Sequence, residues 1–127
     1  MQGVTIENRV PVFEDERGKI FDLFENQVHH VGLITFSAGA VRAKHYHKQS
    51  IQYSYVLEGV VELIVCPKDE PSKRETFEMP EGTAVSIQPG IVHAYRAKTS
   101  AAILDLTTLS RADNGYEDDV VRVDMEI

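Results

Sequence analysis

Short segments of alternating apolar and polar residues, separated by turn residues, run along most of this chain and restrict it to an all-β fold. Alternation is typical of strands that bury one face, and no segment has a convincing helical period. Glycine and proline mark the turns between the segments. The expected strands are Lys19–Glu25, Val31–Ser37, Ile51–Leu57, Val60–Val65, Arg74–Met79, Thr83–Ile87, Ile91–Ala97, Ala101–Thr107 and Val120–Val123. This spacing predicts a double-sheet jelly-roll barrel from about Lys19 to Thr107, with the terminal segments packed outside it.

The size and charge of the chain set the class of protein to expect. A length of 127 residues suits one domain with one core, so we expect a single domain over residues 1–127. The net charge of −7 argues against a nucleic-acid partner. No apolar run approaches the ~20 residues that cross a bilayer, and the first residues are too polar for a secretion signal. The sequence therefore predicts a cytoplasmic protein without a membrane partner.

Two histidines separated by one residue are the most informative polar feature. His45 and His47 share one face of an expected strand, because side chains alternate along a strand. Gln52 follows shortly after them, and His93 follows a Pro-Gly turn, with Tyr95 on the same face as His93. By parity these side chains point into the barrel, with Tyr95 near its mouth. Burying several polar groups without partners is costly, so we expect a functional site there.

Two chemistries fit these residues. In the first, imidazoles and one oxygen ligand hold a divalent transition metal, which would be zinc, nickel, iron or manganese. The metal ligands would be His45, His47, Gln52 and His93. The amide of Gln52 is a weaker ligand than a carboxylate, but a metal could still bind through the three histidines and water.

The second chemistry is metal-free acid–base catalysis. Histidine is a suitable base for taking a proton from the carbon beside a sugar ketone, and a tyrosine or a second histidine could donate a hydrogen bond to the enediolate. The catalytic candidates are His45, His47 and Tyr95. The substrate-binding candidates are Arg42, for a phosphate, together with Gln52 and Tyr46. Strict alternation puts Arg42 on the face opposite the histidines, so it reaches the site only if the strand bends.

The spacing of these residues resembles the two motifs of the cupin superfamily. The first motif spans residues 39–59, and Gln52 stands where the family usually has Glu. The second spans residues 82–97 and contains His93, with Gln88 in place of the usual Pro. The resemblance implies an all-β, cupin-type double-stranded β-helix, which is a jelly-roll barrel.

The residues around the histidines extend the resemblance. Arg42, Lys48 and Gln52 are placed as in the sugar-nucleotide 3,4-ketoisomerases of deoxysugar pathways. Arg-x-x-His also resembles the dTDP-4-dehydrorhamnose 3,5-epimerases, in which that histidine is the base, and DERG at residues 15–18 resembles the opening of both groups. HYHK before a tyrosine-rich strand resembles the cupin domains of capsular-polysaccharide reductases, some of which hold zinc. All three groups work in the biosynthesis of sugars for surface polysaccharides.

These resemblances imply an isomerase or epimerase that acts on a dTDP-4-keto-6-deoxyhexose-like sugar nucleotide by histidine-based proton transfer. The alternative is a metal-binding cupin that binds a small molecule, with or without catalysis. Exposed strand edges in such barrels are commonly covered by a second subunit. We therefore expect a homodimer that uses the N-terminal strand or the face with Tyr53 and Tyr55.

Overall fold

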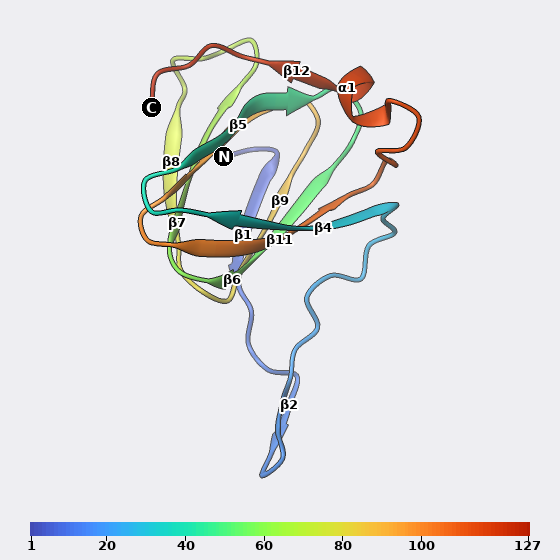
Figure 1. The fold of residues 1–127 in the computed structure, drawn as a ribbon, viewed down its shortest axis with the longest axis vertical. Helices are drawn as coiled ribbons and strands as arrows, with labels where there is room; N and C mark the ends of the chain where they lie inside the picture. The colour runs from blue at the N-terminus through green and yellow to red at the C-terminus, as the bar shows by residue number, and fades with distance from the viewer.

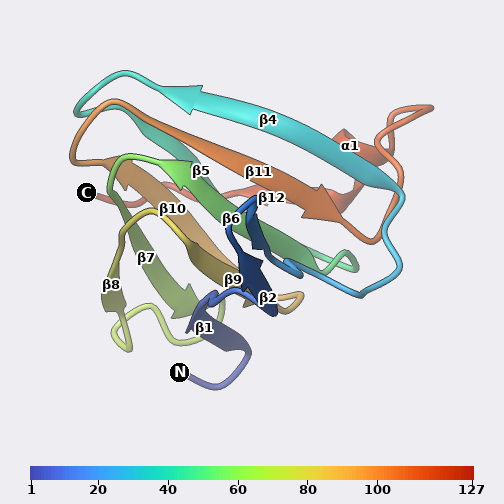
Figure 2. The ribbon, with the colours of Figure 1, turned by 90° about the horizontal axis from the view of Figure 1, so that it is seen from below.

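The computed structural model describes residues 1–127 and has two five-stranded sheets that face each other (Figure 1, Figure 2). The elements in chain order are β1 (Val4–Asn8), β2 (Phe13–Asp15), β3 (Gly18–Ile20), β4 (His30–Phe36), β5 (Val41–His47), β6 (Gln52–Glu58), β7 (Val61–Pro67), β8 (Glu75–Met79), β9 (Thr83–Ile87), β10 (Ile91–Ala97), β11 (Ala101–Thr107), α1 (Gly115–Asp119) and β12 (Val120–Arg122). The first sheet has the order β1-β9-β6-β11-β4 and the second β12-β5-β10-β7-β8. All neighbouring strands are antiparallel, which confirms the predicted jelly-roll barrel.

The space between the two sheets is filled by aliphatic side chains over most of its length. Val56 and Ile103 of the first sheet and Leu63 and Val65 of the second are fully buried there. Burying each such side chain contributes about 1.5–3 kcal/mol. Along β6 the inward residues change from Val56 to Ser54 and Gln52, and these are also buried. The polar residues are therefore gathered at one end of the barrel, which we call the polar end.

Both terminal segments belong to the sheets, so the predicted limits of the barrel at Lys19 and Thr107 are wrong. β1 pairs with β9 over residues 4–8, and β12 pairs with β5 over residues 120–122. The reason is that an edge strand presents unpaired N–H and C=O groups, and a further strand satisfies them. After β12, the chain covers the outer face of the second sheet, where Met125 packs with a small apolar cluster.

The predicted strand Lys19–Glu25 is also wrong. The strand in this region is β3, which ends at Ile20 and pairs only with β2. The β2–β3 hairpin projects from the body of the molecule as an arm (Figure 1), so residues 21–25 have no neighbouring strand to pair with. The remaining predicted strands are confirmed, three of them with the observed ends and five with one or both ends displaced by one or two residues. No helix is long and apolar enough to cross a membrane.

Candidate functional site

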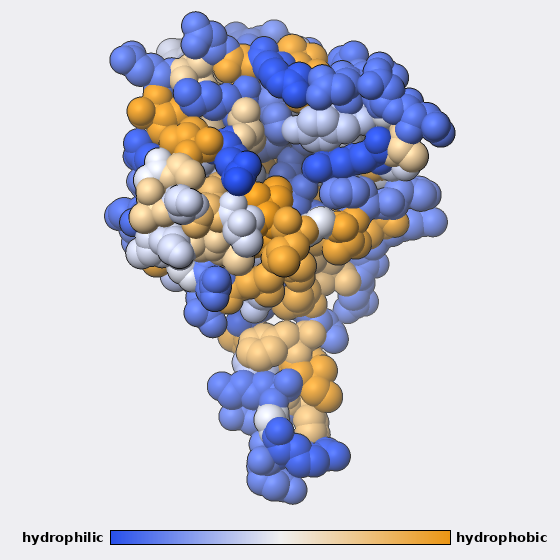
Figure 3. Space-filling model, in the orientation of Figure 1, coloured by the Kyte–Doolittle hydropathy of each residue, from blue (hydrophilic) through white to orange (hydrophobic).

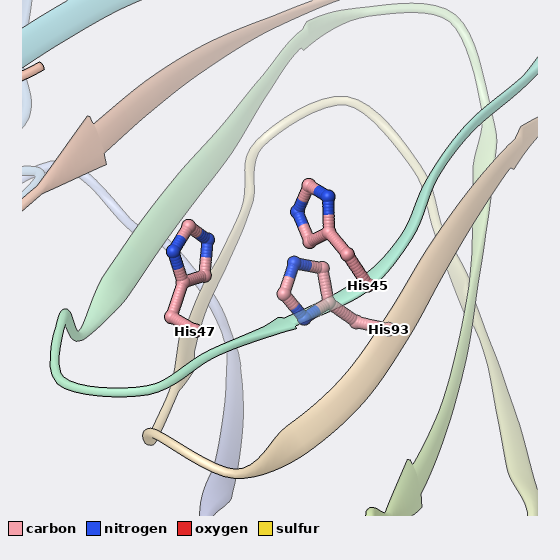
Figure 4. A group of neighbouring side chains, drawn as sticks. All are labelled: His45, His47 and His93. Carbon is pink, nitrogen blue, oxygen red and sulfur yellow. The ribbon is translucent and has the colours of Figure 1, made fainter. Parts of the chain in front are cut away.

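The histidines of both motifs meet at the polar end of the barrel (Figure 4). His45 and His47 lie on β5, and His93 on β10 is the direct cross-strand partner of His45. The ring centroids of His45 and His93 are 4.8 Å apart, and the rings are nearly perpendicular at 88°. One nitrogen from each of the three rings lies within 4.8 Å of the others. The structure thus brings together the three histidines that the sequence singles out.

His47 is held at both of its ring nitrogens. Nδ1 lies 2.8 Å from Oδ2 of Asp119, and Nε2 lies 2.8 Å from Oε1 of Gln52. A carboxylate and an amide oxygen only accept hydrogen bonds, so both nitrogens of His47 act as donors in this arrangement. Asp119 comes from α1 and also accepts from the backbone N–H of Gln49 at 2.7 Å. These contacts fix the position and orientation of the His47 ring.

Gln52 connects the two sheets through its amide. Its Nε2 donates to Oδ1 of Asp105 at 2.6 Å and to the hydroxyl of Tyr95 at 3.3 Å. Oδ2 of Asp105 in turn accepts from Nη2 of Arg111 at 2.8 Å. An ionised glutamate, the residue usual in the motif, could not donate to Asp105. The local network therefore favours an amide at this position, because an amide both accepts and donates at neutral pH.

Of the three clustered histidines, His45 is the one whose ring makes no hydrogen bond, and it faces a cavity of about 190 Å³. The cavity is lined by Ile34, Phe36, Arg42, Ala43, His45, Gln52, Tyr95, Asp105, Arg111 and Tyr116. Burial, followed by the nearby charge of His47, lowers the pKa of His45 from 6.5 to about 4. His45 is therefore neutral at neutral pH and has a lone pair that can accept a proton from a ligand in the cavity.

A bulge in β5 brings Arg42 to the same cavity. Ala43 and Lys44 have positive φ angles of 74° and 59°, and the register with β10 shifts beside them. An extra residue of this kind reverses the parity of the strand beyond it. Arg42 therefore lies on the cavity side, as expected only for a bent strand, and donates to the carbonyl of Thr35 at 3.0 Å.

Of the candidate tyrosines, Tyr46 lies outside the cavity, on the face that strict alternation gives it, and Tyr95 lies deeper than expected. Tyr46 is on the outer side of β5, where it packs against the apolar cluster under the C-terminal tail, with Nζ of Lys68 5.5 Å from its ring centroid. It does not line the cavity. Tyr95 lines the cavity but is only 2% exposed, so it lies deep in the barrel and not at its mouth. Its hydroxyl is bonded to Ser54 at 2.8 Å, and burial raises the pKa of Tyr95.

The C-terminal segment supplies three site residues that the sequence did not reveal. Asp119 bonds to His47, and Arg111 and Tyr116 form part of the cavity wall. The guanidinium of Arg111 lies over the ring of Tyr116, 4.5 Å from its centroid. Burial raises the pKa of Tyr116. The acidic sequence and the turn at residues 113–115 are visible in the chain, but no spacing rule connects them to the histidine motifs.

The three histidines could hold a metal ion. His93 offers the best donor, because its Nδ1 lies 3.0 Å from the carbonyl of Ile91 while its buried Nε2 has no partner. His47 fits less well, since it would have to give up its bond to Gln52 before Nε2 could coordinate. The residues therefore fit a metal only after His47 is released from the network.

This chain matches a known family in sequence and several solved structures in fold. A family profile described as the cupin domain matches residues 32–107. No curated protein matches the chain. The sugar 3,4-ketoisomerase QdtA from Thermoanaerobacterium thermosaccharolyticum, solved in complex with TDP, is 18% identical with a TM-score of 0.80, and the alignment covers 97% of this chain and 90% of QdtA.

Two epimerases share the same fold. ChmJ, a 3'-monoepimerase from Streptomyces bikiniensis solved with dTDP-quinovose, is 22% identical with a TM-score of 0.76 over 89% of this chain and 67% of ChmJ. The dTDP-4-dehydrorhamnose 3,5-epimerase from Sulfolobus tokodaii is 18% identical with a TM-score of 0.76 over 100% of this chain and 83% of the epimerase. The family profile covers more than half of the chain and includes all three histidines. This protein therefore belongs to the cupin domain family.

Proposed function

We propose that this cupin is an isomerase or epimerase of a sugar nucleotide, in which His45 takes a proton from the carbon beside the sugar ketone. The observation that carries the proposal is the state of His45, whose ring lines a cavity, makes no hydrogen bond within the chain and is neutral at neutral pH. The likeness to the ketoisomerase QdtA and to two epimerases supports this reaction class.

The size and lining of the cavity fit the sugar part of such a substrate. Its volume of about 190 Å³ is below the ~300–1,000 Å³ of pockets that enclose a drug-sized ligand. The sugar would enter, and the nucleotide would remain outside. Arg42 is exposed on the cavity side of β5, where a guanidinium can bind a diphosphate in bidentate fashion. In this proposal His47 and Tyr95 position the site through their hydrogen bonds and do not touch the substrate.

The test is exchange of solvent deuterium into TDP-4-keto-6-deoxyglucose, the sugar nucleotide bound in one QdtA complex. The wild-type protein should exchange the proton beside the ketone. His45→Asn should reduce the rate by ~10²–10⁴-fold, which is the usual contribution of a general base. His29→Asn is the matched control, because His29 is exposed and its ring bonds only to the carbonyl of Thr108. Equal rates in wild type and His45→Asn would refute the role of His45.

A second candidate function is metal-dependent binding of a small molecule. The observation in its favour is the buried and unpaired Nε2 of His93, close to two other imidazoles. Its test is metal analysis of protein purified without an affinity tag or added metal. One equivalent of zinc, nickel, iron or manganese, removed by His93→Asn, would support this candidate. Metal-free protein that exchanges deuterium would support the first.

We also infer that the working form is a homodimer. The exposed large apolar residues are concentrated on the arm and on the outer face of the first sheet: Val10, Val12, Phe13, Ile20 and Phe21 on the arm, and Val31, Leu33 and Leu57 on the sheet. Figure 3 displays apolar surface on the arm and on the body next to it. Two apolar surfaces on one molecule suit a two-fold symmetric contact. In such a dimer, the arm of each subunit covers the outer face of the first sheet of its partner.

A further inference from the structure

The chain after β12 forms a short C-terminal tail, residues 123–127, which runs from β12 towards the side of β8 (Figure 1). At its start, the N–H of Val123 donates to the carbonyl of Lys44 at 2.8 Å. In its middle, the side chain of Met125 is 8% exposed and packs in the apolar cluster on the outer face of the second sheet. Near its end, a backbone carbonyl accepts from Nη1 of Arg74 at 2.8 Å. The tail is therefore held to the second sheet at three points.

The bond from Val123 goes to the residue that makes the bulge in β5. Two neighbouring residues of β10 pair with His45 and Ala43, so Lys44 between them has no partner on that strand. Ala43 and Lys44 both have positive φ angles, which strain residues with a Cβ. Such a conformation persists only where the surrounding structure holds it. The N–H of Val123 bonds to the carbonyl of Lys44 from the side of β5 opposite to β10, and this contact holds the bulge.

The bulge decides whether Arg42 can reach the cavity. A regular β5 would point Arg42 to the face opposite the histidines, and the inserted residue reverses that parity. With the bulge in place, Arg42 lines the cavity, and its guanidinium bonds to the carbonyl of Thr35 through Nε at 3.2 Å and Nη2 at 3.0 Å. His45 and His47 do not depend on the tail in this way, because they pair directly with β12. The tail is thus linked to Arg42 through the bulge.

We propose that Val123 is a positioning residue for substrate binding, which keeps Arg42 at the cavity by holding the bulge of β5. The guanidinium of Arg42 uses Nε and Nη2 on Thr35, so the N–H groups of Nη1 are left for a phosphate oxygen. If the bulge relaxes, the strand regains its regular parity and the guanidinium is withdrawn from the phosphate. His45 keeps its place, so proton transfer is unaffected. This inference rests on the proposed function, which gives Arg42 a diphosphate to bind.

The experiment measures the Kd of TDP, the ligand present in one QdtA complex, by calorimetric titration of the full chain. Val123→Pro removes the N–H that bonds to Lys44, and the preceding Arg122 is in a strand, a conformation that a following proline favours. We expect the Kd to rise about 10-fold, because charge-assisted hydrogen bonds to the phosphates are lost. The rate of deuterium exchange at saturating substrate should stay within about twofold of the wild-type rate, since only ground-state binding is weakened. Val123→Ala is the matched control, because it keeps the N–H, and its Kd should equal that of the wild type.

Two further variants separate a role through Arg42 from a general effect on the fold. Met125→Ser removes the buried anchor of the tail but leaves every backbone group in place, so it should also raise the Kd. Adding Val123→Pro to Arg42→Gln should cause no further rise, because both changes act on the same contact. Circular dichroism checks that each variant is folded.

The outcomes separate this inference from the proposed function. A wild-type Kd in folded Val123→Pro would overturn the inference and leave the proposed function intact. If Val123→Pro does not fold, a wild-type Kd in Met125→Ser overturns it instead. Equal rises in Val123→Pro and Val123→Ala would trace the effect to side-chain packing, and a further rise on the Arg42→Gln background would show that the tail does not act through Arg42. Either result would also overturn the inference. Failure of the wild-type protein to bind TDP would refute the proposed function, and this inference with it.

Discussion

Gln52 must both accept and donate hydrogen bonds, because its amide oxygen faces His47 and its amide nitrogen faces Asp105. A carboxylate in its place would still accept from His47. It would also bring a second negative oxygen to the position now 2.6 Å from Oδ1 of Asp105. Two carboxylates at that distance repel each other unless they share a proton. The departure from the usual motif residue is therefore a structural requirement of this chain.

We expect Gln52→Glu to lower the free energy of unfolding at neutral pH by about 1–3 kcal/mol, because a buried donor is lost and like charges are brought together. The loss should be smaller in mild acid, where the carboxyl pair can hold one proton. Urea unfolding at the two pH values measures both effects. Gln27→Glu, which adds the same charge at an exposed site, should have little effect. Equal stability of the two variants would contradict the network.

His45 should make the protein sensitive to acid. Its pKa is about 4 in the folded protein against 6.5 without burial, so the unfolded chain binds more protons between these values. Stability should therefore fall as the pH drops through this window. Replacing His45 by Asn should remove up to about 3 kcal/mol of the stability that the wild type loses in acid. Unfolding midpoints measured across the window test this, and parallel pH profiles for wild type and variant would exclude it.

The bulge of β5 determines which side chains of that strand share the cavity. Parity along a strand holds only while the period is two residues, and the inserted residue at Ala43–Lys44 changes the side to which Arg42 points. The sequence indicated that this strand would have to bend for Arg42 to reach the site, but alternation alone cannot locate such a bend.

We expect Ala43→Gly to be stabilising by up to about 1 kcal/mol, because the positive φ of 74° strains a residue with a Cβ and glycine relieves that strain. Ala43→Val should destabilise the protein, since a branched Cβ is still less compatible with this conformation. Ala84→Gly on β9 is the control and should be destabilising, because Ala84 is a buried residue in a regular strand. Melting temperatures measured by calorimetry compare the stabilities of these variants. Equal losses in both glycine variants would rule out strain at the bulge.

Apart from β1, the sequence predicted the strands of the two sheets and the meeting of His45, His47 and His93, because both depend on local alternation and on motif spacing. It did not predict Tyr116 or Asp119 as site residues. Their contacts depend on how a loop folds back after β11, and no periodic pattern encodes that path. The predicted strand from Lys19 was also too long. Residues 21–25 mix apolar and polar side chains as a half-buried strand does, but no neighbouring strand is available for them to pair with.

For the whole molecule, the arm is the strongest indication of a partner. A two-stranded hairpin by itself is marginally stable in water, and this one has exposed Val12, Phe13 and Ile20. Light scattering should therefore give the mass of a dimer. Leu33→Lys should shift the mass towards the monomer by placing a charge in the outer face of the first sheet. Val41→Lys, at an exposed apolar residue outside both surfaces, should leave the dimer intact. A monomer mass for the wild-type protein would contradict the inference.

The contribution of α1 to the polar end also bears on synthesis of the protein. Ribosomes make a chain from its N-terminus, so the strands β1 to β11 are complete before Asp119 and Tyr116 exist. Until α1 has left the ribosome, His47 lacks its carboxylate partner and the cavity lacks one wall. A nascent chain that stops before residue 115 could form most of both sheets and still be inactive. The proposed activity would thus appear late in translation, after most of the barrel has been made.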